Sequence, residues 1–77
     1  MPEYPKLTAK SAERLLLQNG FTLERQKGSH RIYIKNIYRM VVPHHPGEIL
    51  HPKIIKQLFE VIDEAELVRR SKEHPHF

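Results

Sequence analysis

Three turn signals divide the middle of the chain into short segments, and their spacing limits the fold more than any other feature. Glycine adopts a positive φ freely, and asparagine tolerates the left-handed region, so each signal can end or reverse a regular element. The signals are Asn19–Gly20, Lys27–Gly28 and Asn36–Ile37. They predict short extended strands over Phe21–Gln26, His30–Lys35 and Tyr38–Val42. Strands so close in sequence are expected to pair as an antiparallel meander.

An amphipathic segment precedes the strands. It is expected to begin at Thr8, whose hydroxyl can cap a free first-turn amide, and to end at Asn19–Gly20. Its apolar stripe comprises Ala12, Leu15 and Leu16, and Leu17 could widen it. This pattern predicts a helix with one face against a core.

A second amphipathic segment follows a loop that begins at Pro43. It opens at His51–Pro52, with proline at the favoured first helical position. Its apolar stripe is broad and comprises Ile54, Ile55, Leu58, Phe59 and Ile62. The sequence leaves two ends open, one near Ile62 and one near Arg70. The remainder, residues 71–77, is expected to be frayed.

These elements predict an α+β fold, a two-layer sandwich of order α-β-β-β-α with both helices on one face of a three-stranded antiparallel sheet. The 77 residues suffice for one domain, with a folded body over about residues 7–70. By strand alternation, His30, Ile32 and Ile34 share one face of the sheet. The other face is expected to carry Arg31, Tyr33, Lys35 or their neighbours into solvent.

Charge is distributed unevenly along the chain. Residues 1–59 hold ten Lys or Arg against four acids, a balance of +6, whereas residues 60–77 hold three against five, a balance of −2. Between Arg25 and Arg39 there are five cationic residues and no acid. A surface of this kind attracts a polyanion such as a phosphate backbone, although an ordinary solvated surface is the alternative.

Composition also indicates the compartment. The chain contains no cysteine, and no stretch of it approaches the roughly 20 apolar residues that a membrane span requires. The first residues lack the apolar run of a secretory signal. We therefore expect a soluble, cytoplasmic protein without membrane association.

His30 is the first candidate for chemistry, because it directly follows a glycine turn inside the acid-free segment. Histidine is the side chain best suited to proton transfer near neutral pH. Its shared face with Ile32 and Ile34 leaves an alternative, a hydrogen-bonded histidine at the edge of the core.

The wider sequence resembles the HicA family of toxin–antitoxin mRNA interferases. The resemblance rests on Gly20–Phe21, on the six-residue run Arg25–His30 and on Val41–Val42–Pro43–x–His45, and it extends from about Thr8 to Ile62. One departure is the opening of the last helix, where His51–Pro52–Lys53–Ile54 replaces a Gly-Thr-Leu-like sequence.

The resemblance implies a double-stranded-RNA-binding-domain-like fold and an endoribonuclease that cuts mRNA without a metal or other cofactor. It places the catalytic histidine at His30. It also implies a HicB-type antitoxin partner that holds the toxin inactive. We expect the free toxin to be a monomer.

Other residues are candidates for supporting roles. Lys27 could stabilise transition-state charge, Gln26 and Ser29 could orient phosphate oxygens or the imidazole, and His45 is a candidate second acid or base. An ordinary polar hairpin turn is the alternative for the first three. The candidate RNA-binding residues are Arg25, Lys27, Arg31, Tyr33, Lys35 and Arg39. For the strand residues among them, cross-strand pairing is the alternative.

His44, His45 and His51 raise the alternative of a metal site. Adjacent histidines point apart in an extended chain, and only Glu48 is near enough in sequence to add a carboxylate, so loop histidines are favoured over metal ligands. Three rival functions stay open at this point: a non-catalytic RNA-binding module, a metal-dependent nuclease or zinc protein, and a pure interaction protein.

Overall fold

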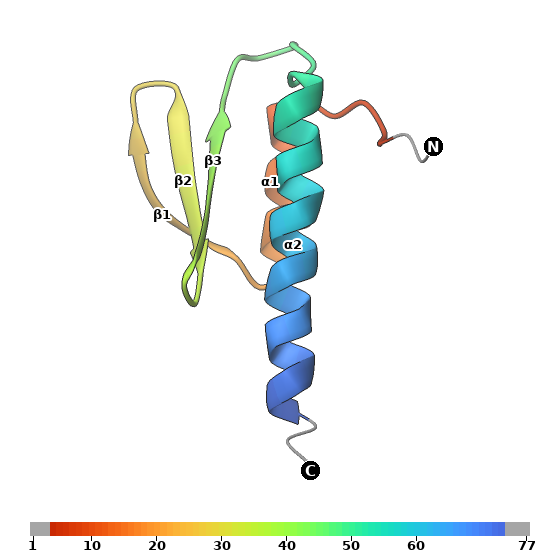
Figure 1. Cartoon of the computed structure of the whole chain (residues 1–77). Helices are drawn as coiled ribbons and strands as arrows, with labels where there is room; N and C mark the ends of the chain where they lie inside the picture. The colour runs from red at the N-terminus through yellow and green to blue at the C-terminus, as the bar shows by residue number, and fades with distance from the viewer. Residues whose placement is uncertain (1–3, 74–77) are drawn as a thin grey trace.

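The computed structural model describes residues 4–73, with side chains described through residue 67. The elements in chain order are α1 (Ala9–Gln18), β1 (Thr22–Lys27), β2 (His30–Lys35), β3 (Tyr38–Pro43) and α2 (Pro52–Glu73). The strands form one antiparallel sheet in the order β1-β2-β3, and both helices lie on one side of it (Figure 1). The predicted α+β architecture of order α-β-β-β-α is confirmed.

The helix ends follow the predicted capping chemistry. The hydroxyl of Thr8 accepts a hydrogen bond from the backbone N–H of Ser11 at 3.2 Å, and Gly20 takes a φ of 90° after α1. At the start of α2, Nδ1 of His51 accepts a hydrogen bond from the backbone N–H of Lys53 at 3.0 Å. The departure from the family pattern at this point therefore still gives a capped helix.

Helix α2 is longer than either predicted end. It extends to Glu73, beyond Arg70, so residues 71–73 of the predicted frayed tail are helical. Residues 74–77 of that tail lie outside the described residues. Within the described part of the chain, no helix is long and apolar enough to cross a membrane.

The core lies between the helices and the sheet. Ala12 and Leu16 of α1 and Ile55 and Leu58 of α2 are buried in it, as their stripes predict. Leu17 does not widen the stripe of α1, since 51% of it is exposed. The sheet and its approach add four fully buried large side chains: Phe21, Tyr33, Met40 and Val42.

The predicted assignment of β2 side chains to the two faces is wrong. Tyr33 is fully buried, and its Cα partner Met40 is buried beside it. Opposite residues on paired strands share a face, so the register places Arg31, Tyr33 and Lys35 on the side of the helices. Ile32 lies on the other face and is absent from the core cluster.

Partners on helix α1 and at its C-terminal end explain why this side of β2 faces the helices. The Tyr33 ring fills the core, and the cations on either side of it find partners there. Arg31 pairs with Glu13 at 2.9 Å. The Lys35 ammonium donates to the carbonyl of Asn19 at 2.7 Å and lies over the Phe21 ring at 5.9 Å from its centroid. A polar–aromatic–polar pattern can therefore face inward when each polar group is paired.

The loop between β3 and α2 is tied to the segment before α1. Thr8 and Ile49 form an isolated antiparallel bridge, and the backbone N–H of Leu50 donates to the carbonyl of Leu7 at 2.8 Å. The backbone N–H of His44 donates to the carbonyl of Ser29. These contacts hold the loop between the N-terminal end of α1 and the β1–β2 hairpin.

Candidate functional site

The β1–β2 hairpin holds His30 at its tip. Gly28 has a φ of 59°, and the Gln26 side-chain amide donates to its carbonyl at 3.0 Å, which fixes the turn. His30 is the first residue of β2, and its Cα partners are Lys27 on one side and Pro43 on the other. The imidazole is exposed. The candidate proton-transfer group is thus accessible to solvent, with the Lys27 ammonium on the facing strand.

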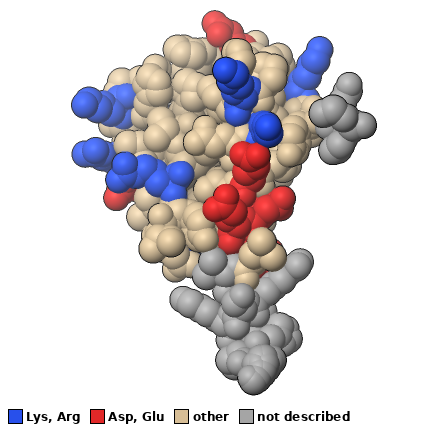
Figure 2. Space-filling view, in the orientation of Figure 1, with Lys and Arg blue, Asp and Glu red and all other residues tan. Residues whose placement is uncertain are grey.

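The sheet face away from the helices, called here the open face, carries three exposed cations beside His30. The strand register places His30, Ile32 and Ile34 of β2 on this face, with Val41 of β3 beside Ile32. The cations on this face are Arg25, Lys27 and Arg39, all exposed. Figure 2 shows Lys and Arg side chains on the strand side and at the upper end of the helix side, with most of the visible acidic side chains grouped below them along α2.

The predicted RNA-binding residues therefore separate into two groups. Arg25, Lys27 and Arg39 belong to the open face with His30. Arg31, Tyr33 and Lys35 face the helices and make intramolecular hydrogen bonds. Because Tyr33 is fully buried, its ring cannot stack on a base in this conformation.

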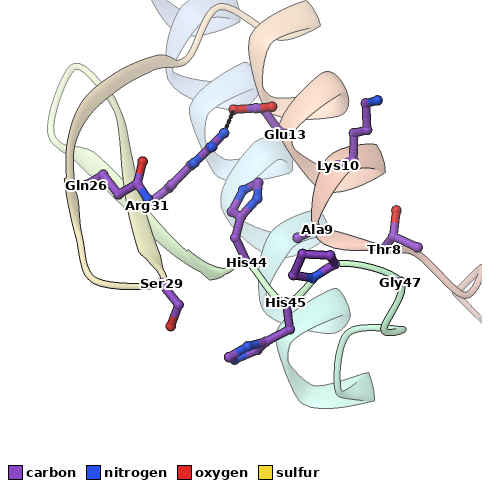
Figure 3. Close-up of a pocket in the computed structure, with 11 residues that line it drawn as sticks. Thr8, Ala9, Lys10, Glu13, Gln26, Ser29, Arg31, His44, His45 and Gly47 are labelled. Atoms are coloured by element: carbon purple, nitrogen blue, oxygen red, sulfur yellow. Dashed lines mark hydrogen bonds and ion pairs between the residues drawn. The ribbon is translucent and has the colours of Figure 1, made fainter.

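A cavity of about 580 Å³ lies on the opposite, helix-facing side of the hairpin tip. It is enclosed by the N-terminal end of α1, the hairpin and the loop after β3 (Figure 3). Gln26, Ser29 and His45 line it, whereas His30 and Lys27 do not. The structure thus divides the predicted site, with three supporting residues on the cavity side and the predicted catalytic residue on the open face.

A polar cluster reaches from this cavity into the core. The carboxylate of Glu13 accepts hydrogen bonds from Arg31 at 2.9 Å and from the Tyr33 hydroxyl at 2.7 Å, both at Oε2. The Tyr33 oxygen also lies 3.3 Å from Nε2 of His44. Three of the four side chains, those of Glu13, Arg31 and His44, line the cavity.

The cluster shifts the pKa of its members. The hydrogen bond from Tyr33 is the main cause of a lowered pKa of Glu13, and Arg31 lowers it further by hydrogen bonding and charge. Burial, with the contact to Glu13, raises the pKa of Tyr33 to about 12. Burial and the charge of Arg31 lower the pKa of His44 below its ordinary value. At neutral pH the cluster therefore contains a carboxylate, a guanidinium, a neutral phenol and a neutral imidazole.

Sequence reasoning did not identify Glu13, although the pattern contained a signal. Glu13 stands four residues after Ala9 and three before Leu16, so it lies on the buried stripe of α1. A carboxylate in such a position requires a partner. His44 carried no comparable signal, because its burial depends on how the loop packs against α1.

The three loop histidines do not converge. Figure 3 shows the His44 ring directed toward Arg31 and Glu13 and the His45 ring directed away from them. His51 caps α2 through Nδ1. Among the described residues, no group of three or more His, Cys, Asp or Glu side chains is arranged to hold a metal ion.

Comparison with known proteins gives one match. A family model described as the HicA toxin of bacterial toxin–antitoxin systems matches residues 9–67, which includes both helix stripes and the whole sheet. No curated protein and no solved structure matches the chain.

Proposed function

Since the chain belongs to the HicA toxin family of bacterial toxin–antitoxin systems, we propose that it is an mRNA endoribonuclease whose proton-transfer group is His30. The observation that carries the proposal is the placement of this imidazole. It is exposed at the hairpin tip, opposite Lys27 and on the same sheet face as Arg25 and Arg39. Cations that are exposed and free of ion pairs suit a phosphate backbone.

The reaction is cleavage by the RNA itself, assisted by proton transfer. The ribose 2′-oxygen attacks the adjacent phosphorus, a 2′-O–P bond forms, and the P–O5′ bond breaks. His30 accepts the 2′-hydroxyl proton, and a second group donates a proton to the departing 5′-oxygen. The 2′-hydroxyl is the nucleophile, so the reaction requires RNA. Two side chains carry both proton transfers in this proposal, which assigns no step to a metal ion or to the ribosome.

The neighbours of His30 serve this reaction in different ways. The Lys27 ammonium faces His30 across the strand pair and stabilises the added charge on the phosphorus oxygens. Gln26 fixes the turn through its bond to the carbonyl of Gly28, so its role is positioning. His45 is exposed two residues after Pro43, the Cα partner of His30, and is the candidate donor to the leaving oxygen.

RNA contact is assigned to the open face. Arg25, Lys27 and Arg39 hold the phosphates, and the half-buried Ile34 with the exposed Val41 gives unpaired bases an apolar surface. Arg31 and Lys35 lie on the opposite side of the sheet, bonded to Glu13 of α1 and to the carbonyl of Asn19, so they are not assigned to RNA contact.

The partner and location follow from the same assignment. A HicB-type antitoxin that covers the open face with acidic side chains would block His30 and the phosphate-binding cations together. Such a partner also stabilises a small fold by mass action. A toxin that acts on mRNA works in the cytoplasm, and the free chain is proposed to be a monomer.

The test is cleavage of a single-stranded RNA by the purified full chain in excess chelator. The expected products end in a 2′,3′-cyclic phosphate and a 5′-hydroxyl, and a DNA copy of the substrate stays intact. Binding of RNA without cleavage would overturn the enzyme assignment in favour of a non-catalytic RNA-binding module. Cleavage that stops in chelator and resumes with added metal would overturn the metal-independent mechanism.

A further inference from the structure

The cavity beside Glu13 has the size and polarity of a ligand site. Of the residues assigned to the cleavage reaction, only Gln26 and His45 line it. Its volume of about 580 Å³ lies within the range of roughly 300–1,000 Å³ typical of small-molecule sites. Its walls come from three separate parts of the chain, joined by the bridge between Thr8 and Ile49 and by the bond from His44 to Ser29. A pre-formed cavity of this kind requires little reorganisation to bind.

The charge on the cavity wall favours an anion. Lys10 and Arg31 are its cations, and Glu13 is its one carboxylate among the lining residues. That carboxylate already accepts hydrogen bonds from Arg31 and from Tyr33 at the same oxygen. Lys10 is exposed and has no ion pair within the described residues, so it is available for a phosphate group.

The same cavity also presents groups that can recognise a base. Since the Tyr33 hydroxyl donates to Glu13, the contact at 3.3 Å requires Nε2 of His44 to carry the proton and donate to the Tyr33 oxygen. This fixes the tautomer of the neutral imidazole and makes Nδ1 an acceptor. Gln26 and Ser29 add an amide and a hydroxyl from the hairpin. Donors and acceptors thus line the same cavity as the cation Lys10.

The cavity adjoins the proposed reaction centre on the other side of one hairpin tip. Strand alternation places Lys27 and His30 on the open face and Gln26 and Arg31 on the cavity side. Ser29, at the turn, lines the cavity directly before His30. A single-stranded RNA that bends over the tip therefore meets both sides with neighbouring nucleotides.

We propose that this cavity is a nucleotide subsite, which binds one unpaired ribonucleotide next to the phosphate presented to His30. The inference rests on the proposed endoribonuclease function. It assigns Lys10 to the phosphate of that nucleotide, and His44, with Ser29 and Gln26, to its base and sugar. On this view, part of the sequence preference of cleavage is determined on the cavity side, away from His30.

The test is an NMR titration of the full-length wild-type chain with mononucleotides, which contain no phosphodiester bond for it to cleave. The four ribonucleoside 3′-monophosphates are added separately, with unphosphorylated nucleosides and inorganic phosphate as further arms. At least one nucleotide should bind saturably, with shifts at Lys10, Ser29, His44 and Gly47, and more tightly than phosphate or its own nucleoside. Equal affinity for phosphate alone, or shifts confined to Arg25, Lys27 and Arg39, would overturn the subsite.

Two variants locate the binding and one serves as the control. Lys10→Ala removes the exposed cation without affecting the core, and His44→Phe removes both imidazole nitrogens while retaining an aromatic ring. Each should weaken nucleotide binding about tenfold, the loss expected for one hydrogen bond to a charged or buried group. Arg14→Ala, an exposed cation on α1 outside the cavity lining, should leave the affinity unchanged. An equal effect of all three would contradict the assignment.

The cleavage assay and the titration together separate the two proposals. If the wild-type protein cleaves no RNA, the proposed endoribonuclease function is wrong, whether or not a nucleotide binds the cavity. If wild-type protein cleaves RNA and no nucleotide shifts the cavity residues, the subsite alone is wrong.

Discussion

The hydroxyl of Tyr33 donates a hydrogen bond of 2.7 Å to the carboxylate of Glu13, and this contact joins the centre of the sheet to helix α1. Tyr33 is fully buried, so the phenol needs a partner within the protein. Glu13 supplies it from the buried stripe of α1. The pair also brings Arg31 and His44 to one place, where they line the cavity beside the hairpin tip.

Tyr33→Phe should destabilise the fold measurably. The substitution retains the ring but leaves the partly buried carboxylate with Arg31 as its partner. We expect a loss of about 1–3 kcal/mol in the free energy of unfolding, measured by urea denaturation. The pKa of Glu13 should also rise, since the bond from Tyr33 is the largest cause that lowers it.

Tyr38→Phe is the matched control for this change. Tyr38 lies on the neighbouring strand and is half-buried against the core, and its hydroxyl makes no hydrogen bond within the described residues. Tyr38→Phe should change the free energy of unfolding by no more than about 0.5 kcal/mol. Equal destabilisation by both substitutions would mean that the Tyr33–Glu13 hydrogen bond makes no specific contribution to the free energy of unfolding.

The sequence predicted the elements well, because local chemistry determines their limits. The predicted cap, turns and helix start lie where expected, at Thr8, at Gly20 and Gly28, and at Pro52. Each depends on the side chain or the backbone freedom of the residue itself. The face of β2 that packs against the helices could not be predicted in the same way. The alternation of side chains in β2 is compatible with either face being buried. The face that carries Tyr33 is buried because its polar groups find partners on α1 and at the C-terminal end of α1, which are distant in sequence.

Stability should fall as the pH is lowered from 8 toward 4. The folded-state pKa of His44 lies below its ordinary value of 6.5, and that of Glu13 lies below 4.5. In both cases the side chain binds a proton more readily in the unfolded chain than in the folded protein. The contribution of each group to stability is therefore complete above its unfolded-state pKa and is lost as the pH falls through its folded-state pKa.

Denaturation at a series of pH values separates the two groups. His44→Phe should flatten the part of the profile between about pH 7 and 5, and Glu13→Gln should flatten the part below it. A stability profile for His44→Phe that keeps the wild-type slope near pH 6 would show that the half-buried imidazole is not responsible.

Lys27→Ala should weaken RNA binding without affecting stability, whereas Lys35→Ala should affect stability without changing the salt slope of RNA binding. Lys27 is exposed on the open face, so its removal should change stability by less than about 0.5 kcal/mol. It should weaken RNA binding and reduce the salt slope of the affinity by about one charge. Binding is measured with RNA and the His30→Ala background at several salt concentrations.

The Lys35 ammonium is bonded to the carbonyl of Asn19 and lies over Phe21. Lys35→Ala should cost about 0.5–1.5 kcal/mol of stability and leave the salt slope unchanged. A reduced salt slope for Lys35→Ala would place RNA on the helix-facing side and contradict the assignment to the open face.

Gly28 should tolerate asparagine but not valine. Its φ of 59° is left-handed, and a Cβ there would meet no atom within 4 Å, so only backbone conformation limits the substitution. Asparagine adopts this region with little penalty, whereas valine should cost about 1–2 kcal/mol. RNA cleavage should persist in Gly28→Asn. A loss of cleavage in a folded Gly28→Asn protein would mean that the glycine is needed for close approach of the substrate.

The candidate site could be read from the sequence only in part. His30 and the cations Arg25, Lys27 and Arg39 follow one another along adjacent strands, so their common face follows from short-range pairing. The cavity could not be foreseen. It requires the loop after β3 to pack against the first turn of α1, and no local pattern near His44 or Lys10 predicts that contact.

The central claim is that His30 transfers a proton during RNA cleavage, and the single-turnover cleavage rate of His30→Ala tests it most directly. Because His30 is exposed, the variant should unfold like the wild type. His51→Asn controls for loss of a histidine elsewhere, since asparagine keeps a side-chain acceptor for the cap of α2. We expect a rate about 10²–10⁴-fold below that of the wild type for His30→Ala, with His51→Asn unchanged. A folded His30→Ala protein that cleaves the same RNA at the wild-type rate would contradict it.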